Sequence, residues 1–269
     1  MDDALFKQWR ELCDAKHGQK CCMQRNINLG VSPSWLIDVF EMRLVSGEGH
    51  VKDYMALSYV WGKIEMLKTT KENLTFLQES VSLVRLRAQI PWTIRNAIHV
   101  ARKSEIKYLW VDSLCIVQDD EANLHHQLRI MASIYENASV TIIAADGENA
   151  NSGIRGIRHG AYSLPRKSLP FFDLPDYISI TFSGDQAGLD NSTWAKRAWT
   201  LQEFIFSPRK LIFYQGTLHS TVALQNMSVP RTGYQPVSAI LESPLSGASL
   251  EVVLGQRFGI RLRSTITDT

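Results

Sequence analysis

The sequence predicts an α/β fold in which a parallel sheet is flanked by helices. Short, almost entirely apolar runs of the kind that are buried on both faces of a sheet alternate with amphipathic helical segments. Strands that alternate with helices in this way are typical of βαβ units, which form parallel sheets. The segments that carry the alternation are 54–60, 91–101, 108–111, 124–135 and 139–144.

The N-terminal part is predicted to contain a helix and then a β-hairpin. Residues 4–16 have a one-sided apolar pattern, and residues 1–33 are expected to form a helical leader. A β-rich segment at 35–44 is followed by a polar turn and by the strand at 54–60. Because only this turn separates the two strands, they are expected to pair as a hairpin.

The central elements follow in a regular order. Pro91 is predicted to open the first long helix, where its missing N–H does no harm. The apolar stripe of that helix is formed by Ile94, Ala97, Ile98 and Ala101. The strand at 108–111 ends before Asp112, and a second amphipathic helix ends near Asn137.

The alternation is interrupted and then resumes. Residues 148–193 are rich in Gly, Ser, Asn and Pro and are interpreted as an insertion, with a candidate strand at 177–182. A helix at 199–206 and a strand at 210–214 complete a core domain that spans residues 34–216. Residues 217–269 show no sustained amphipathic period and are interpreted as a weakly patterned tail.

Composition argues against several classes of protein. Hydrophobic residues make up 45% and charged residues 21%, which is ordinary for a globular protein. The net charge of +2 gives no general electrostatic basis for binding nucleic acid or an acidic membrane. No apolar stretch approaches the ~20 residues of a membrane helix. The N-terminus is too polar for a secretory signal, so a cytoplasmic location is expected.

Cysteine and histidine residues suggest two sites, neither of which is favoured. On a helix, Cys13, His17 and Cys21 would share a face, with Cys22 beside them, but their spacing fits no common zinc pattern. A packed or surface helix is the preferred interpretation, and no metal ligand is predicted. Cys115 is a candidate nucleophile with His125 or His126, although a buried structural cysteine is far more common.

Polar and aromatic residues gather at one edge of the predicted sheet. The strands end at Trp61 and Gly62, at Asp112 and Ser113, and at Asp146 and Gly147. The segment 197–203 follows the third core strand and can lie over the same edge. Because ligands bind at the carboxyl ends of parallel strands, these four pieces of sequence predict a single crevice.

The segment 197–203 suggests a chemistry. On a helix, Trp199 and Glu203 lie on one face, one turn apart. The tryptophan can stack on a flat heterocycle, and the carboxylate can stabilise positive charge that develops on the attached sugar. Two structural explanations remain open, because Thr200 and Glu203 also form a capping-box pattern and because large aromatic residues such as Trp199 usually belong to the core.

The remaining candidates each have a binding role and a structural one. Arg197 can pair with a pyrophosphate or form a surface salt bridge. Asp112, with Ser113 beside it, can bind ribose hydroxyls or cap the turn that follows. Trp61 and Gly62 can line the mouth of the crevice, where a glycine permits close backbone approach, although packing is the commoner role for such a tryptophan.

The ordered series of blocks resembles the fungal heterokaryon-incompatibility domain, or HET domain. The resemblance covers about residues 30–216, and the cysteine-containing leader is also similar to that of such proteins. At one point the sequence departs from the family, because Asn123 and Leu124 stand where a tryptophan is usual. The resemblance implies a part in non-self recognition between fused fungal cells, leading to growth arrest and cell death. The matching blocks are 54–62, 90–101, 108–120, 131–147 and 194–203.

A more distant resemblance is to TIR domains, which have a flavodoxin-like fold. Residues 197–204 have the Trp-x3-Glu spacing, and the leucine between, of the plant-type segment Ser-x-Trp-Cys-Leu-x-Glu-Leu. The resemblance implies that Glu203 is the catalytic residue of an NAD⁺ glycohydrolase that cleaves the nicotinamide–ribose bond. NAD⁺ is then the substrate and no cofactor is required. The insertion at 148–193 lies where TIR domains are short.

Other functions are consistent with the same residues. The domain can be a non-enzymatic signalling module that triggers cell death through self-association and partner recruitment, or a regulatory or decayed relative. The expected partners are NAD⁺ or a related nucleotide, further copies of the chain and an upstream recognition protein. Neither nucleic acid nor a membrane span is expected.

Overall fold

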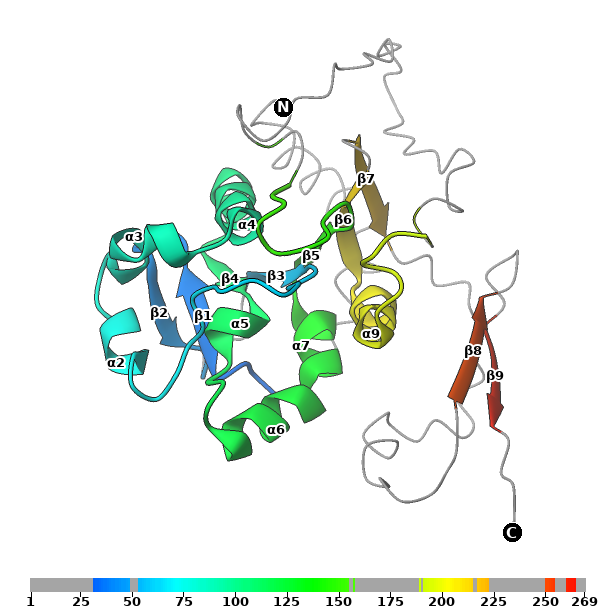
Figure 1. The fold of residues 1–269 in the computed structure, drawn as a ribbon, viewed down its shortest axis with the longest axis horizontal. Helices are drawn as coiled ribbons and strands as arrows, with labels where there is room; N and C mark the ends of the chain where they lie inside the picture. The colour runs from blue at the N-terminus through cyan, green and yellow to red at the C-terminus, as the bar shows by residue number, and fades with distance from the viewer. Residues whose placement is uncertain are drawn as a thin grey trace. The chain divides into compact units, whose positions relative to one another are not determined.

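The computed structural model describes two compact units of the chain, Met1–Leu224 and Gln225–Thr269. The first unit contains a seven-stranded sheet (Figure 1), and the second contains the antiparallel pair β8 (Leu250–Leu254) and β9 (Ile260–Ser264). The helix predicted at 4–16, the cysteine cluster around His17 and the strand predicted at 177–182 lie outside the described residues. The described residues are 31–48, 53–154, 157, 189, 191–214 and the backbones of 217–222, 250–254 and 260–264.

The large sheet is mixed, with a parallel centre, and has the order β2-β1-β4-β3-β5-β6-β7. The central strands β4, β3, β5 and β6 are parallel, as predicted. The predicted parallel pairing is confined to this centre, because β1 pairs antiparallel with β4, and β7 pairs antiparallel with β6. The strands are β1 (Trp35–Asp38), β2 (Arg43–Ser46), β3 (Tyr54–Ser58), β4 (Tyr108–Trp110), β5 (Val140–Ala144), β6 (Arg209–Tyr214) and β7 (Thr217–Val222). Strand β7 therefore extends the sheet with residues from the segment 217–269, which was predicted to be a weakly patterned tail.

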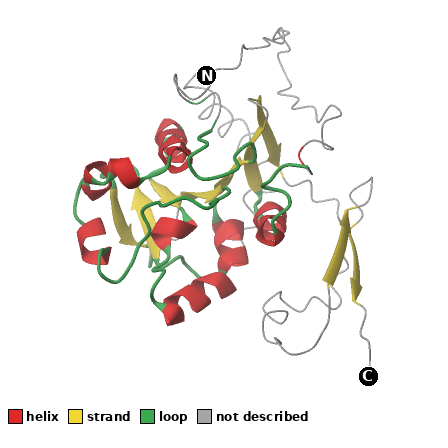
Figure 2. Ribbon diagram, viewed as in Figure 1, coloured by secondary structure: helices red, strands yellow, loops and turns green. Residues whose placement is uncertain are grey.

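Helices cover both faces of this sheet (Figure 2). α4 lies on one face, whereas α7 and α9 pack together on the other (Figure 1). This division follows from right-handed crossovers, because the chain moves from β3 outward to β4 and then returns past β3 to β5. The helices are α2 (Leu74–Leu77), α3 (Ser82–Arg85), η1 (Arg87–Gln89), α4 (Trp92–Lys103), α5 (Asp112–Cys115), α6 (Glu121–Arg129), α7 (Met131–Asn137) and α9 (Ala198–Phe206).

The N-terminal hairpin forms between different strands from those predicted. Asp38 lies within the segment 35–44, and its buried carboxylate accepts hydrogen bonds from the backbone N–H groups of Phe40 (3.0 Å) and Glu41 (2.9 Å). A short polar side chain that bonds to the following backbone in this way turns the chain. The segment therefore splits into β1 and β2, which pair with each other, while β3 enters the centre of the sheet.

Two predicted helices are observed with small differences. The predicted stripe of α4 is buried, which confirms the amphipathic pattern, although Pro91 occupies the N-cap position rather than the first turn. The second predicted helix is divided into α6 and α7 at Ile130, whose backbone (φ −94°, ψ 5°) departs from helical geometry. α7 contributes Tyr135, which packs edge-on against Trp110 of β4 with ring centroids 5.4 Å apart.

Candidate functional site

The predicted residues meet where β3 and β5 end. These strands are neighbours in the sheet, but the chain visits β4, on the other side of β3, between them. A parallel sheet leaves a crevice at such a reversal of strand order, outside the carboxyl ends of the strands. Ser58, the last residue of β3, is in register with Ile143 of β5. The residues after these strands therefore lie at one edge of the sheet, as predicted.

Glu203 lies at this edge and is almost fully buried. Its side chain comes from α9, is 5% exposed and accepts a hydrogen bond from the hydroxyl of Ser58. The Ser58 oxygen in turn accepts a hydrogen bond from the indole N–H of Trp194, at 2.7 Å. The carboxylate is thus tied to the end of β3 by a short chain of buried hydrogen bonds.

The ionisation of Glu203 is displaced toward neutral pH. Burial is the largest cause and raises the pKa of this carboxyl from 4.5 to about 7, because the charged form loses hydration. The negative charge of Asp112 adds to the increase, whereas the hydrogen bond from Ser58 and the positive charge of Arg197 oppose it. A strongly perturbed pKa of a buried carboxyl at the carboxyl ends of strands is a feature of many functional groups.

The capping-box explanation of Thr200 and Glu203 was wrong. Arg197, not Thr200, is the N-cap residue of α9, and the helix begins at Ala198. The Thr200 hydroxyl donates a hydrogen bond to the Arg197 carbonyl at 2.6 Å, while the Glu203 side chain bonds to Ser58. The three-residue spacing of Thr200 and Glu203 is therefore not a capping box, because the Glu203 carboxylate faces the sheet.

Asp112 forms a second carboxylate centre at the end of β4. Its Oδ2 accepts a hydrogen bond from the indole N–H of Trp61 (2.8 Å), and its Oδ1 accepts one from the backbone N–H of Ser113 (2.7 Å). Burial raises the pKa of Asp112 to about 6, although these two bonds and the charge of Arg197 lower it. Asp112 is thus the first residue of α5 and bonds to the backbone of the turn that follows it, whereas its binding of ribose hydroxyls stays a prediction.

Tyr59 and Arg197 connect the two carboxylate centres. The Tyr59 hydroxyl donates to the Ser113 oxygen at 2.9 Å, and the Arg197 guanidinium donates to the backbone carbonyl of Tyr59. Burial, followed by the charge of Asp112, raises the pKa of Tyr59 well above its usual range. Arg197 is the positive charge that acts on Tyr59, Asp112 and Glu203.

Gly62 is required by the loop that follows β5. It has a φ of +68°, and a Cβ atom placed there would lie 2.3 Å from Cβ of Asn149. The adjacent Trp61 carbonyl accepts a hydrogen bond from the backbone N–H of Ala150 at 3.0 Å. The absence of a side chain thus allows this loop to dock beside Trp61, which is half-buried.

Gly62→Ala is expected to destabilise the fold by about 1–3 kcal/mol, because both the positive φ and the contact with Asn149 disfavour a side chain. Urea unfolding measures the effect. Lys63→Ala, a change at the exposed neighbouring position, is the control and is expected to leave the unfolding midpoint in place. Equal midpoints for the two variants would show that the loop does not need the glycine.

The structure brings together most of the predicted residues and adds three. Trp61, Gly62, Asp112, Ser113, Arg197 and Glu203 take part in the contacts described above, whereas the side chain of Trp199 lies outside the described residues. The sequence did not predict the contacts that Ser58, Tyr59 and Trp194 make in this cluster. Ser58 could have been found, because a hydroxyl within an otherwise apolar buried strand needs a hydrogen-bond partner.

The structure tests one of the two cysteine hypotheses, because Cys13, His17, Cys21 and Cys22 lie outside the described residues and Cys115 lies within them. Within the described residues, no group of three or more His, Cys, Asp or Glu side chains is arranged to bind a metal ion. Cys115 is fully buried, and burial raises the pKa of its thiol to about 12, whereas His125 and His126 are exposed. Because the thiolate is the nucleophile, Cys115 is a packing residue at neutral pH.

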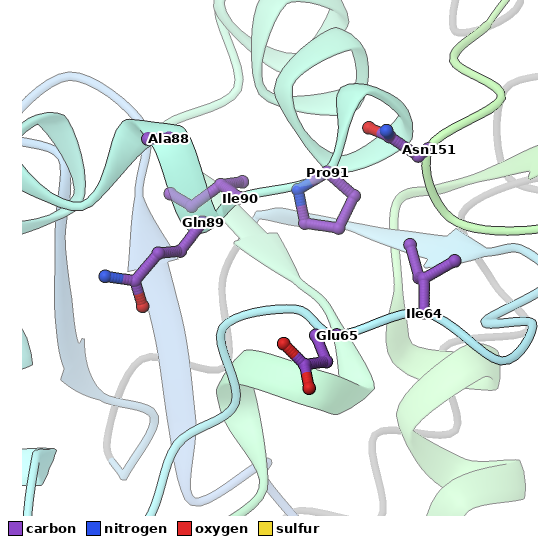
Figure 3. A pocket seen from close by; sticks show the side chains of 7 residues that line it. All are labelled: Ile64, Glu65, Ala88, Gln89, Ile90, Pro91 and Asn151. Carbon is purple, nitrogen blue, oxygen red and sulfur yellow. The ribbon is translucent and has the colours of Figure 1, made fainter.

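A small hollow of about 130 Å³ lies beside α4 (Figure 3). Its lining includes Ile64 and Asn151, which belong to the two segments that meet at Gly62, but it includes none of the predicted site residues. The hollow is therefore distinct from the Glu203 cluster. Its lining residues are Ile64, Glu65, Ala88, Gln89, Ile90, Pro91 and Asn151.

Stability is expected to fall as Glu203 ionises. Its pKa is higher in the folded protein, about 7, than its ordinary 4.5, so the folded state retains the proton more strongly. The stabilisation is therefore present below pH 4.5 and is lost as pH rises through 7.

The variant Glu203→Gln lacks this dependence of stability on pH. Relative to wild type, the variant is expected to gain roughly 2–3 kcal/mol between pH 4.5 and pH 8. Urea unfolding across this range measures the gain, and a constant difference would show that Glu203 has an ordinary pKa in the fold.

Comparison with known proteins identifies the family. The family model described as "Heterokaryon incompatibility protein (HET)" matches residues 54–203, which is more than half of the chain. A relative named "Heterokaryon incompatibility protein 6, OR allele", from Neurospora crassa, is 26% identical over 56% of this chain. The matched region spans 27% of that relative's length. No solved structure matches the chain. Among the described residues, no helix has the length and apolar character needed to cross a bilayer. The chain belongs to the heterokaryon incompatibility (HET) family.

Proposed function

We propose that this HET domain cleaves the nicotinamide–ribose bond of NAD⁺, with Glu203 as the key carboxylate. The observation that carries the proposal is the position of this residue. Its carboxylate is buried at the end of β3, has a pKa of about 7 and lies within the electrostatic influence of Asp112 and Arg197. It therefore changes charge near neutral pH, where a catalytic carboxyl is most useful.

The chemistry requires the ionised form of Glu203. Cleavage of the nicotinamide–ribose bond passes through an oxocarbenium-like state, in which positive charge develops on the ribose. A carboxylate fixed in a poorly hydrated site stabilises that charge more strongly than one in water. Nicotinamide leaves as a neutral base, so the reaction needs no general acid. The rate is accordingly expected to rise with pH as Glu203 loses its proton.

The neighbouring residues have complementary roles in this proposal. Asp112 and Ser113 bind the ribose hydroxyls, and Arg197 pairs with the pyrophosphate. Trp61 and Gly62 line the mouth of the crevice, and the ring of Trp199 stacks on the heterocycle. The strand order β4-β3-β5-β6 supports a flavodoxin-like or TIR-like core, because it corresponds to the order 2-1-3-4 of such sheets.

The family supplies the biological context of the proposal. The relative from Neurospora crassa is named for heterokaryon incompatibility, and we extend that role to this chain. NAD⁺ loss after contact between unlike fungal cells leads to growth arrest and regulated cell death. The domain acts in the cytoplasm, assembles with further copies and responds to an upstream recognition protein.

The low exposure of Glu203 favours a rival function in one respect. A glutamate that is 5% exposed and hydrogen-bonded to a buried serine can serve packing alone. The domain would then be a non-enzymatic module that triggers death by recruiting partners. This rival predicts that loss of the Glu203 charge leaves toxicity intact.

Expression in fungal cells separates the two functions. NAD⁺ content and viability are followed after induction of wild type and of Glu203→Gln, with equal protein levels verified by immunoblot. The proposal predicts that wild type depletes NAD⁺ before viability falls and that the variant does neither. If cells that express the variant die while their NAD⁺ content stays normal, the domain is the non-enzymatic module instead.

A further inference from the structure

Three buried side chains form a hydrogen-bonded relay that ends at Glu203. Trp194, Ser58 and Glu203 are 3%, 1% and 5% exposed. The indole N–H of Trp194 donates to the Ser58 oxygen at 2.7 Å, and the Ser58 hydroxyl bonds to Oε2 of Glu203. Trp194 is held in turn by edge-on packing against Phe204 of α9, with ring centroids 6.2 Å apart. The relay therefore joins the segment before α9 to the end of β3.

The chemistry of the donors favours one direction for the relay. An indole N–H can only donate, so the Ser58 oxygen must act as its acceptor. The single hydroxyl proton of Ser58 is then directed at Glu203. A carboxylate oxygen accepts this proton readily, and a donor aimed at a carboxyl favours its charged form. The indole N–H also occupies one of the two acceptor positions of the Ser58 oxygen, so its removal would make it easier for this oxygen to accept a proton from neutral Glu203.

We propose that Ser58 and Trp194 are positioning residues, which hold the Glu203 carboxylate in place and favour its ionised form. The proposal rests on the proposed function for its catalytic consequence, but the ionisation itself can be measured without substrate. The residues act through Glu203 and make no contact with substrate in this scheme.

Other groups around Glu203 also favour or disfavour its ionised form. Burial and the charge of Asp112, at the start of α5, both disfavour the carboxylate. Arg197, at the N-cap of α9, and the Ser58 hydroxyl favour it. Burial, followed by the negative charge of Glu203, raises the pKa of Tyr135 of α7. Within this set, Ser58 donates the hydrogen bond observed to the Glu203 side chain.

The test is a direct titration of Glu203 in the full chain. Carbon-detected NMR follows the side-chain carboxyl carbons of ¹³C-labelled glutamate, and the resonance missing from Glu203→Gln assigns Glu203. Ser58→Ala is expected to raise the pKa of Glu203 by about one unit or more, because it removes the donor. Trp194→Phe, which retains a ring beside Phe204, is expected to shift the pKa in the same direction by less. Ser58→Thr keeps the hydroxyl and is expected to restore the wild-type value.

The matched control is Ser207→Ala. Ser207 is also a buried hydroxyl beside α9, but it bonds to Thr141 and to the backbone carbonyl of Glu203 rather than to the carboxylate. Its removal is expected to lower stability without moving the pKa of Glu203. Equal Glu203 pKa values in Ser58→Ala and wild type would overturn the proposal, as would an equal shift in Ser207→Ala.

The catalytic consequence is measured separately. At pH 7, Ser58→Ala is expected to cleave NAD⁺ about five- to tenfold more slowly than wild type, with recovery near pH 9, because a one-unit shift leaves about a tenth of Glu203 ionised. A pKa shift in a protein that does not cleave NAD⁺ would support the relay and refute the proposed function. Cleavage of NAD⁺ by wild type, with no shift in the pKa of Glu203 in Ser58→Ala, would support the proposed function and refute the relay.

Discussion

Glu203→Gln is expected to slow nicotinamide release from NAD⁺ by roughly 10²–10³-fold, the usual loss when one preorganised electrostatic group is removed from an active site. The amide has nearly the same shape as the carboxylate and can still accept the hydrogen bond from Ser58, so the fold is expected to survive. It carries no negative charge and therefore cannot stabilise an oxocarbenium-like state. The measurement is kcat on protein assembled by crowding or by fusion to an oligomeriser.

Glu136→Gln is the matched control for this variant. Glu136 lies on α7, is half-buried, and burial raises its pKa, but it has no place in the site. Its substitution is expected to leave kcat unchanged. Asp112→Asn is informative in a different way, because weaker ribose binding is expected to raise KM more than it lowers kcat. Equal activity of wild type and Glu203→Gln would remove Glu203 from the mechanism.

Trp110→Ala is expected to destabilise the protein by about 3–5 kcal/mol, the range found when large aromatic side chains are truncated in a core. Trp110 is fully buried in β4 and packs edge-on against Tyr135 of α7. The hydroxyl of Tyr135 donates to the Leu57 carbonyl of β3 at 3.2 Å, so the cavity would loosen the helix that borders Glu203. Urea unfolding measures the loss.

The variant Trp110→Phe separates two contributions of Trp110 to stability, the packing of its ring and the burial of its indole N–H. The indole N–H of Trp110 is buried and has no hydrogen-bond partner. Phenylalanine keeps part of the ring and removes this unsatisfied donor, so a smaller loss of about 1–2 kcal/mol is expected. A Trp110→Ala variant with nearly the stability of wild type would show that β4 and α7 do not depend on this contact.

The sequence predicts elements of this fold better than it predicts their pairing. The apolar runs at β3, β4 and β5 and the stripe of α4 are local patterns, and burial of those residues confirms them. The pairing of β1 with β2 and β4 depends instead on one turn at Asp38 and on contacts distant in the chain. A β-rich segment without glycine or proline gives little sign of such a turn.

The candidate site was likewise predictable only in part. The edge at which Trp61, Asp112 and Glu203 gather follows from the shared direction of the central strands, which alternating helices and strands predict. The partner of Glu203 does not follow, because Ser58 lies 145 residues earlier in the chain. The pattern formed by Thr200 and Glu203 fits a helix cap equally well, and only the observed start of α9 excludes it.

Nicotinamide release from NAD⁺ by the assembled chain, measured from pH 5 to pH 9, tests the central claim most directly. Burial places the pKa of Glu203 at about 7 in the folded protein, and the ionised form is the active one. The account predicts a rate that rises through about pH 7 and levels off above it, and no such rise for Glu203→Gln. Absence of nicotinamide at every pH, or the same profile for the variant, would contradict it.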